Sequence, residues 1–425
     1  MSNPTSSNPD YYERVAATLR GEKPDCAPFV TRLEIWYSSC VRAGTLPEAY
    51  KHPTMTPHST IMSLFTVPVP PDFSGIDLTS LHLAVGAGQQ VQTISHARRL
   101  RGVELKLTFN GDEIFHEKDP VVDFFPRLFG MIPPDRPGET CAEFITPKGT
   151  LSTRTSLSQE NIDMGAVPIM KEHPIKSIED APAFEYIFEQ AEFVPGFKKV
   201  ANLQEGLGKT GFVVPMLNRL PFQQLTLDHV GEVAFFYMLA DYPQVVERMI
   251  TLLDKVMLED LRQVENFNSP YIQFDDNLDG MITNPKLFAR YVLPHYQQYT
   301  DILHRQGKKV GSHTDGNIKR LLAPLKDSGL DICESFSPYP LTPCTFDEAW
   351  NAWQDTGPII WGGIPSPLLQ PETTQADFET YVDHVLELAR TRPMIFSIAD
   401  MLLPNNMIER VKILSDKINA FTSAT

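Results

Sequence analysis

One histidine and several acids come directly after short apolar runs of the sequence, each of the length expected for a buried strand. The four residues whose types fit one site are His313, Asp315, Glu334 and Asp400. His313 and Asp315 are two residues apart, so their side chains point to the same side of an extended chain. Imidazole and carboxylate groups are ligands that suit zinc or another divalent transition metal. We therefore predict a metal site at which Glu334 and Asp400 complete the shell begun by His313 and Asp315.

The same acids have an alternative role as helix caps. Asp315 and Asn317 precede a predicted helix, and Asp and Asn are favoured at the N-cap. Capping explains any one acid as well as metal binding does. It explains four polar groups at successive strand ends less well, and so we favour the metal site.

A second polar stretch, Asp275-Asp276-Asn277, follows another apolar run. Adjacent strand residues face opposite ways, so only one of the two aspartates can enter a shared site, and the other anchors a loop. A carboxylate in the site can act as a general base or hold a substrate hydroxyl. The candidate catalytic residues are therefore Asp275, Asp276 and Glu334.

Other residues near these strand ends are placed to contact a substrate. The candidates are Arg32, Glu34, Trp36, Asn277, Tyr339 and Trp361. Arg32 and Glu34 flank Leu33 at the end of the first predicted strand, and the aromatic residues would form the walls of a pocket. Large aromatic side chains more often pack in the core, and that alternative stays open for each of them.

The scaffold that would gather these residues is an α/β barrel. From Phe212 onward, apolar runs typical of buried parallel strands alternate with amphipathic helices. The predicted strands are 212–216, 271–274, 309–312, 331–333, 358–361 and 394–398. This many units with short connections favour a closed (β/α)8 TIM barrel, in which catalytic groups lie where strands end and βα loops begin.

The region before this pattern predicts a helix over 10–20, a strand over 27–35 and two β-hairpins. The hairpins span 105–116, with Asn110-Gly111 at the turn, and 144–155, with a turn at 147–149. We expect N-terminal β-hairpin insertions within about 100–160 of a single barrel domain that spans residues 1–425. The polar residues 1–9 are expected to be a disordered tail.

Composition excludes several classes of protein. The chain has 425 residues and a net charge of −16, which repels nucleic acids and anionic lipid headgroups. No apolar run approaches the roughly 18 residues that span a bilayer. The five cysteines contain no CxxC pair, which is typical of free thiols in a reducing compartment, and the signatures of dinucleotide binding, P-loop phosphoryl transfer and serine hydrolysis are missing. We expect a cytoplasmic protein that binds neither nucleic acid nor membranes.

Three segments, 12–28, 311–317 and 396–400 followed by Pro404, carry a family resemblance. As a set they resemble the uroporphyrinogen decarboxylase-like superfamily, and within it the branch of zinc-dependent, corrinoid-linked methyltransferases. The first segment is similar to the family's N-terminal helix and first strand. The middle segment, Gly-Ser-His-Thr-Asp-Gly-Asn, is similar to the His-x-Cys-Gly stretch that binds zinc in the methyltransferases, and the last aligns with the position of their final cysteine ligand.

The chain departs from this family pattern at the metal ligands. Both cysteine positions carry aspartate here, Asp315 and Asp400. A metal held by His and carboxylates is a harder Lewis acid than one held by thiolates, and it suits a methoxy, hydroxyl or carboxylate substrate better than a thiol. The arginine-rich segment with which the decarboxylase proper binds tetrapyrroles is not recovered after Pro28, which argues against haem-pathway activity.

The resemblance implies a metal-dependent methyltransferase of the O-demethylase type, which moves a methyl group between a small oxygen-bound donor and a corrinoid. The chain has no Asp-x-His-x-x-Gly corrinoid signature, so methylcobalamin would come on a separate partner protein. The alternatives are a metal-assisted decarboxylase or lyase of a small carboxylic acid, and a catalytically silent barrel that only binds ligands. The sequence leaves open the substrate, the metal and the oligomeric state, including a homodimer.

Overall fold

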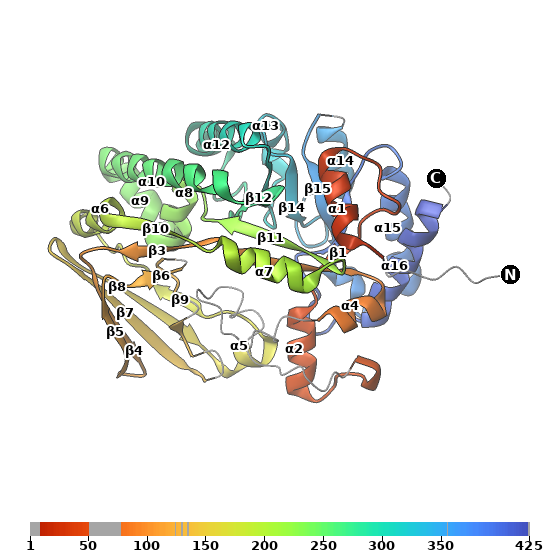
Figure 1. Cartoon of the computed structure of the whole chain (residues 1–425), viewed down its shortest axis with the longest axis horizontal. Coiled ribbons are helices and arrows are strands. Elements are labelled where there is room, and N and C mark those ends of the chain that lie inside the picture. The colour runs from red at the N-terminus through yellow and green to blue at the C-terminus, as the bar shows by residue number, and fades with distance from the viewer. Residues whose placement is uncertain are drawn as a thin grey trace.

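The centre of the computed structural model is a parallel eight-stranded barrel (Figure 1). The structure describes residues 9–50, 78–123, 125–128, 131–133, 136–354 and 356–423. In spatial order the barrel strands are β1 (Val30–Thr31), β2 (Gly88–Ile94), β11 (Gly211–Leu217), β12 (Tyr271–Phe274), β13 (Lys309–His313), β14 (Ile332–Phe336), β15 (Ile359–Pro365) and β16 (Ile395–Ala399). A parallel bridge between Phe29 and Phe396 brings the first and last strands together. The predicted (β/α)8 barrel is therefore confirmed.

The six strands predicted from apolar runs correspond to β11 through β16. Every residue of β11, β12, β14 and β16 is buried. Helices cover the outer face of these strands and side chains fill the inner face, so both faces need apolar residues. Burial on both faces is the reason that continuous apolar runs located these strands correctly.

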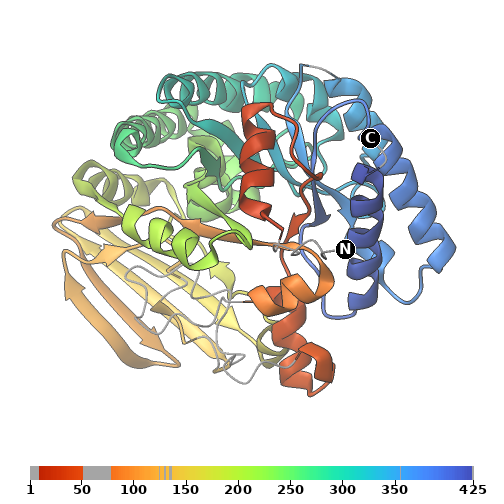
Figure 2. The same ribbon diagram turned by 45° about the vertical axis from the view of Figure 1, so that its right-hand side comes forward.

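A layer of helices surrounds the barrel (Figure 2). Its members include α4 (Thr79–Val85), α7 (Phe197–Leu207), α10 (Pro243–Gln263), α12 (Leu293–Arg305), α13 (Leu322–Lys326), α14 (Phe346–Trp353), α15 (Gln375–Leu388) and α16 (Ile408–Ser423). Within the described residues, none of the helices combines the length and the apolar character needed to cross a membrane.

The first helix, α1 (Tyr11–Arg20), covers the amino-terminal end of the barrel. It confirms the helix predicted over 10–20. Asp10 caps its first turn by accepting a hydrogen bond from the backbone N–H of Glu13 (3.0 Å). The buried face of α1 joins residues at the starts of the strands in one apolar cluster, which includes Tyr11, Val15, Leu19, Phe212, Tyr271, Ile332, Trp361 and Ile395. The opposite, carboxyl end of the barrel is left for the polar residues.

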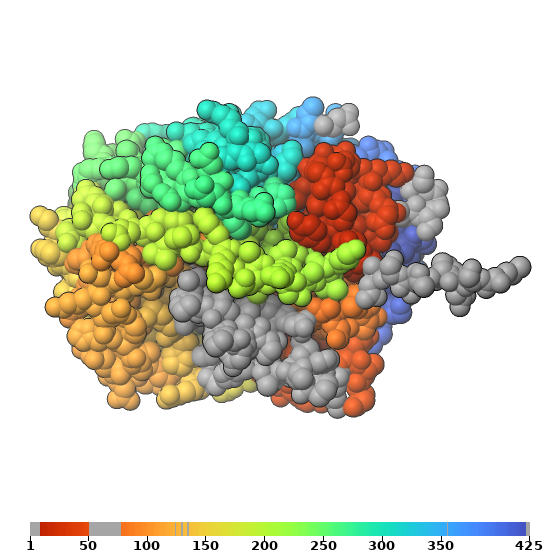
Figure 3. Space-filling view, viewed as in Figure 1, coloured from red at the N-terminus to blue at the C-terminus, as the bar shows by residue number. Residues whose placement is uncertain are grey.

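Between β2 and β11 the chain leaves the barrel and forms two antiparallel sheets at one side of the molecule, orange to yellow in Figure 3. Their strands are β3 (His96–Leu100), β4 (Glu104–Phe109), β5 (Asp112–Lys118), β6 (Val121–Val122), β7 (Gly138–Thr146), β8 (Gly149–Leu157), β9 (Ile169–Glu172) and β10 (Ala191–Pro195). The two predicted hairpins are β4–β5 and β7–β8, and both are confirmed. The insertion is longer than the predicted 100–160, because β3 and β10 pair along their whole length and close its stem.

The structure corrects the sequence interpretation near the N-terminus. The strand predicted over 27–35 is only β1, and α2 (Glu34–Ala43) begins three residues after it. The sequence analysis missed β2, because three of its seven residues are glutamines that point into a buried environment and interrupt the apolar pattern. The predicted disordered tail lies outside the described residues, apart from residue 9.

Trp361 of β15 lies inside the barrel. Its ring is fully buried against Phe212 and Tyr271, with centroid separations of 6.0 and 6.1 Å, and its Nε1 donates to the Val30 carbonyl oxygen (3.2 Å). The predicted role as a substrate-pocket wall does not fit this position. Trp361 is a core residue, the alternative that the sequence left open.

We predict that Trp361→Ala lowers the free energy of unfolding by about 3–5 kcal/mol, the usual cost of truncating a large buried aromatic residue. Urea denaturation followed by circular dichroism measures the change, and Trp361→Phe should lose less. A loss below about 1 kcal/mol, the range of surface substitutions, would contradict a core role.

Candidate functional site

Polar side chains gather at the carboxyl ends of the barrel strands. His313 ends β13 and is paired in register with Glu334 of β14. The register of β14 with β15 then shifts between Glu334 and Phe336, and Ser335 takes a left-handed φ of 60°. Gly362 of β15 permits this bulge, since a Cβ there would lie 2.8 Å from the Phe336 carbonyl oxygen. A β-bulge changes the direction in which side chains point, and this one directs two consecutive residues of β14, Glu334 and Ser335, to the same site.

Glu334 is a buried carboxylate that holds one nitrogen of His313. Its Oε2 lies 2.6 Å from His313 Nδ1 and accepts a second hydrogen bond from Gln273 Nε2 (3.0 Å). Its Oε1 accepts from Gln90 Nε2 (2.7 Å), and the Tyr271 hydroxyl fixes the Gln273 amide (2.8 Å). Both oxygens of Glu334 are therefore occupied, and the residue positions the His313 ring.

The other nitrogen of His313 faces the mouth of the barrel. Nε2 lies 3.6 Å from Asp315 Oδ2 and 3.8 Å from Asp400 Oδ1, which is beyond hydrogen-bond range. The Asp315 and Asp400 side chains are 27% and 39% exposed, whereas that of His313 is 10% exposed. Nε2 is thus the ring nitrogen that a bound molecule can reach.

Charge keeps His313 protonated. Burial alone would lower the pKa of His313, but the carboxylates of Asp315 and Glu334 outweigh it and raise that pKa well above its ordinary value. Burial would likewise raise the pKa of Asp315, yet the charge of His313 lowers it to about 2. The raised pKa favours the imidazolium form of His313, in which both ring nitrogens carry protons.

Arg32, just after β1, is the second cation of the site. Its Nε donates to Glu34 Oε1 (3.0 Å), and its Nη1 donates to Gln92 Oε1 (3.0 Å) and Asp400 Oδ1 (3.3 Å). Arg32 thus reaches the site as predicted, while Glu34 holds the guanidinium. Gln92 was not predicted, and its buried Nε2 donates to no residue that the structure describes.

A second network orients Asp315 from the opposite side. Asn277 Nδ2 donates to both Asp315 oxygens, at 2.8 and 2.9 Å, and Arg219 Nη1 donates to Asn277 Oδ1 and to the Asp275 carbonyl oxygen. Asn277, predicted to contact substrate, therefore orients the carboxylate of Asp315. Arg219 was not predicted. It follows β11 as Asp275 follows β12, so the expectation that site residues come directly after strands identifies it as well.

Asp275 and Asp276 diverge, as adjacent strand residues must. Asp275 accepts a hydrogen bond from Arg127 of the insertion (2.8 Å) and lies near the mouth. Asp276 is fully buried and accepts from the Leu220 N–H (2.8 Å) and the Tyr296 hydroxyl (2.5 Å) of α12. Burial raises the pKa of Asp276 to about 6. Asp276 anchors the turn after β11, and the predicted catalytic role does not fit its position.

In the described part of the chain, the remaining aromatic candidates do not line the site. Trp36 of α2 is buried, and its Nε1 donates to the Asn406 carbonyl oxygen (3.1 Å). Tyr339 is 64% exposed in the loop after β14. Trp36 therefore packs in the core, and Tyr339 is a surface residue.

The side chains as placed do not fit the predicted metal ion. Among the described residues, no three or more His, Cys, Asp or Glu side chains are arranged to hold one. Glu334 binds the far nitrogen of His313, so it cannot share an ion with Nε2. Asp400 Oδ1 is turned to Arg32 and to the Ser335 hydroxyl (3.2 Å), and both oxygens of Asp315 accept from Asn277. In this arrangement Glu334 positions the His313 ring, and its predicted ligand role stays a prediction, as does the ion itself.

The fold and the polar mouth define a (β/α)8 barrel protein whose site lies at the strand ends. The uroporphyrinogen decarboxylase (URO-D) family model matches residues 230–421. These residues contain β12 through β16, and the match confirms the resemblance to the uroporphyrinogen decarboxylase-like superfamily that the motifs predicted.

Solved structures match this fold, among them one that is similar to almost the whole chain. It is a methyltransferase from Methanosarcina mazei, with a TM-score of 0.53 and 13% sequence identity, and the match covers 97% of this chain and 99% of that one. At this identity the likeness shows the fold alone. No curated protein matches the sequence.

We predict that the His313 charge gives the protein a pH-dependent stability. A raised pKa contributes stability that is fully present below about pH 6.5, the usual value of an unfolded histidine, and is lost as the pH rises through the folded value. His313→Gln leaves two carboxylates uncompensated, so it should cost about 3–5 kcal/mol at neutral pH. Urea unfolding at a series of pH values tests this.

The wild type should lose stability on the alkaline side, and His313→Gln should lack that loss. Parallel curves for the two proteins over the alkaline range would show that His313 is not held as a cation.

Proposed function

We propose that the chain is an enzyme that transfers a methyl group from a small oxygen-bound donor, such as a methoxy compound, to a corrinoid carried by a separate protein. The observation that carries the proposal is the placement of His313, whose Nδ1 is fixed by Glu334 while its Nε2 is directed at the mouth. A protonated donor held there can bind an oxygen atom on which negative charge develops, and such preorganised donors are usually the largest catalytic contribution.

The transfer needs a proton at the departing oxygen. As the bond between the methyl carbon and the oxygen breaks, the bonding electron pair stays on the oxygen, which takes the proton from His313 Nε2. The methyl group bonds to the acceptor, and solvent at the mouth returns a proton to His313. Glu334 keeps the ring in place, and Asp315, held by Asn277, keeps it charged between transfers.

Charge at the mouth favours an uncharged donor. His313 and Arg32 face four carboxylates, Glu34, Asp315, Glu334 and Asp400, and the Arg219 cation behind Asp315 offsets only part of this charge. A polyanion would be repelled by this excess of negative charge. The unsatisfied Nε2 of Gln92, beside Arg32, is a ready donor for an ether or hydroxyl oxygen of the substrate.

A second candidate is a decarboxylase or lyase acting on a small carboxylic acid. Arg32 and Gln92 together could hold one carboxylate, and the matching family model is named for a decarboxylase. The proton of His313 would then go to the carbon that loses carbon dioxide.

The test is an assay with free cob(I)alamin and a panel of methyl ethers, followed by the visible spectrum of methylcobalamin. We predict formation with the wild type and a rate about 10²–10⁴-fold lower with His313→Gln, the usual loss for a general acid. His384→Gln is the matched control, because His384 is an exposed histidine on α15 whose partner is Asp347. Absence of methylcobalamin across the panel, with carbon dioxide released from an acid, would favour the second candidate.

A chelation experiment tests the divalent metal predicted from the sequence, with zinc as the first candidate. Since the His313 cation supplies the positive charge in the placement described above, protein dialysed against EDTA should keep its activity. Activity that disappears on chelation and returns only with zinc would show that Asp315 and Asp400 rearrange around an ion with His313.

A further inference from the structure

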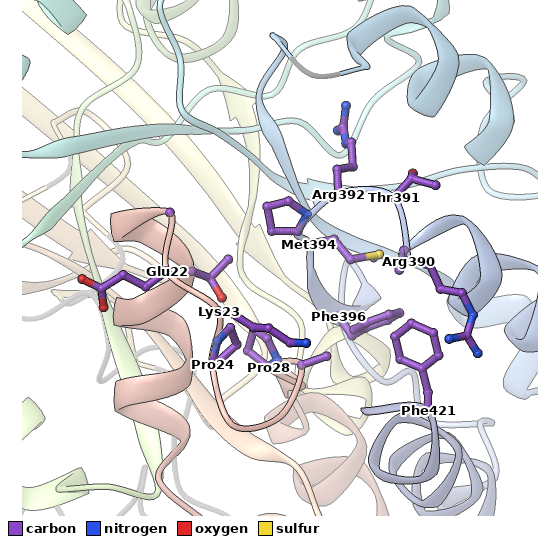
Figure 4. A pocket seen from close by; sticks show the side chains of 15 residues that line it. Glu22, Lys23, Pro24, Pro28, Arg390, Thr391, Arg392, Met394, Phe396 and Phe421 are labelled. Atoms are coloured by element: carbon purple, nitrogen blue, oxygen red, sulfur yellow. The ribbon is translucent and has the colours of Figure 1, made fainter. Parts of the chain in front are cut away.

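A cavity of about 360 Å³ lies at the amino-terminal ends of β1 and β16, the opposite end of the barrel from His313 (Figure 4). Three parts of the chain line it: the end of α1 with the loop from Gly21 to Pro28, the segment from Ala389 to Met394 that leads into β16, and Phe421 of α16. The volume falls within the range of about 300–1,000 Å³ that is usual for small-molecule sites.

The floor of this cavity is apolar. Pro28, Met394 and Phe396 are buried there, and Figure 4 shows the rings of Phe396 and Phe421 side by side. Closure of the barrel fixes this floor, because the Phe396 N–H donates to the Pro28 carbonyl oxygen (2.8 Å). A ligand body that covers the two rings would therefore meet a preformed surface.

The rim of the cavity is basic, in a chain with a net charge of −16. Lys23 and Arg390 contribute to it, whereas the side chain of Arg392 extends away from the two rings and donates to the Gln354 and Pro358 carbonyl oxygens. The acids beside them already have partners: Glu22 pairs with Arg20 (2.7 Å), Asp25 with Arg14 (2.8 Å) and Glu387 with Arg390 (2.7 Å). Among the residues that the structure describes, Lys23 has no carboxylate partner, and Figure 4 shows its side chain extending towards Phe421.

We propose that this cavity binds a small organic monocarboxylate with a flat apolar body. The carboxylate pairs with the Lys23 ammonium, and the body packs on Phe396 and Phe421. One ammonium without an acid partner matches one negative charge, and an apolar floor matches an aromatic or branched aliphatic body. This site is separate from the mouth and does not depend on the proposed function.

Benzoate is the probe, and isothermal titration calorimetry on the full chain is the measurement. Benzyl alcohol keeps the body without the charge, and acetate keeps the charge without the body. We predict that benzoate binds with a Kd of about 1 mM or tighter and that the other two bind more weakly. Lys23→Gln should weaken benzoate about tenfold, the effect of losing one charge-assisted hydrogen bond, and Lys286→Gln, an exposed lysine after β12, should not.

Two further variants locate the binding. Ala389→Phe, which fills part of the cavity, should weaken benzoate, whereas Arg32→Gln at the mouth should leave it unchanged. Equal affinity in wild type and Lys23→Gln, or loss of binding in Arg32→Gln alone, would overturn the proposal. Failure of benzoate to bind the wild type would overturn it as well.

Discussion

The ion pair between His313 and Glu334 determines how the rest of the mouth is arranged. Glu334 has 1% of its surface exposed, and a carboxylate at that depth stays charged only when opposite charge and hydrogen bonds replace its lost water. His313 supplies the charge, while Gln90 and Gln273 supply the hydrogen bonds. Because one nitrogen of the ring is committed to Glu334, the other is directed away from it, towards Asp315 and Asp400 at the mouth.

Barrel geometry makes this pair feasible. His313 and Glu334 are neighbours in register on adjacent strands, and the bulge at Ser335 follows immediately. Gly311 matters for a similar reason, since a Cβ there would lie 1.8 Å from the Tyr271 hydroxyl oxygen that orients Gln273. The inside of the barrel thus holds the hydrogen-bond partners of this pair. The helix α1 and its aromatic cluster cover the amino-terminal end of the barrel.

Much of the scaffold could be predicted from the sequence, because strands buried on both faces are apolar throughout and therefore visible as runs. The strand-end rule also brought His313, Asp315, Glu334 and Asp400 together, and the structure places all four at one mouth. It could not say which nitrogen of His313 each carboxylate faces, since this depends on depth along the strand. Glu334 is 1% exposed, whereas the Asp315 and Asp400 side chains are 27% and 39% exposed, so Glu334 is the carboxylate that positions the ring.

Other features depend on contacts between residues far apart in the chain. Trp361 lies at a strand end in the sequence, yet the inner face of β15 puts it in the core. Arg127 comes from the insertion and reaches Asp275 across 148 positions of sequence, a contact that no local pattern encodes. The strand β2 was not predicted because Gln90 and Gln92 interrupt its apolar run. These two glutamines form hydrogen bonds with Glu334 and Arg32 of the site.

The central claim, that His313 is a cation with a free Nε2–H at the mouth, is tested most directly by ¹⁵N NMR of the imidazole ring, with the signal assigned by its loss in His313→Gln. The account predicts that both ring nitrogens are protonated at neutral pH and that the ring titrates only at a pH well above the usual value of about 6.5. A neutral ring at pH 7, with one nitrogen unprotonated and a pKa at or below about 6.5, would contradict it.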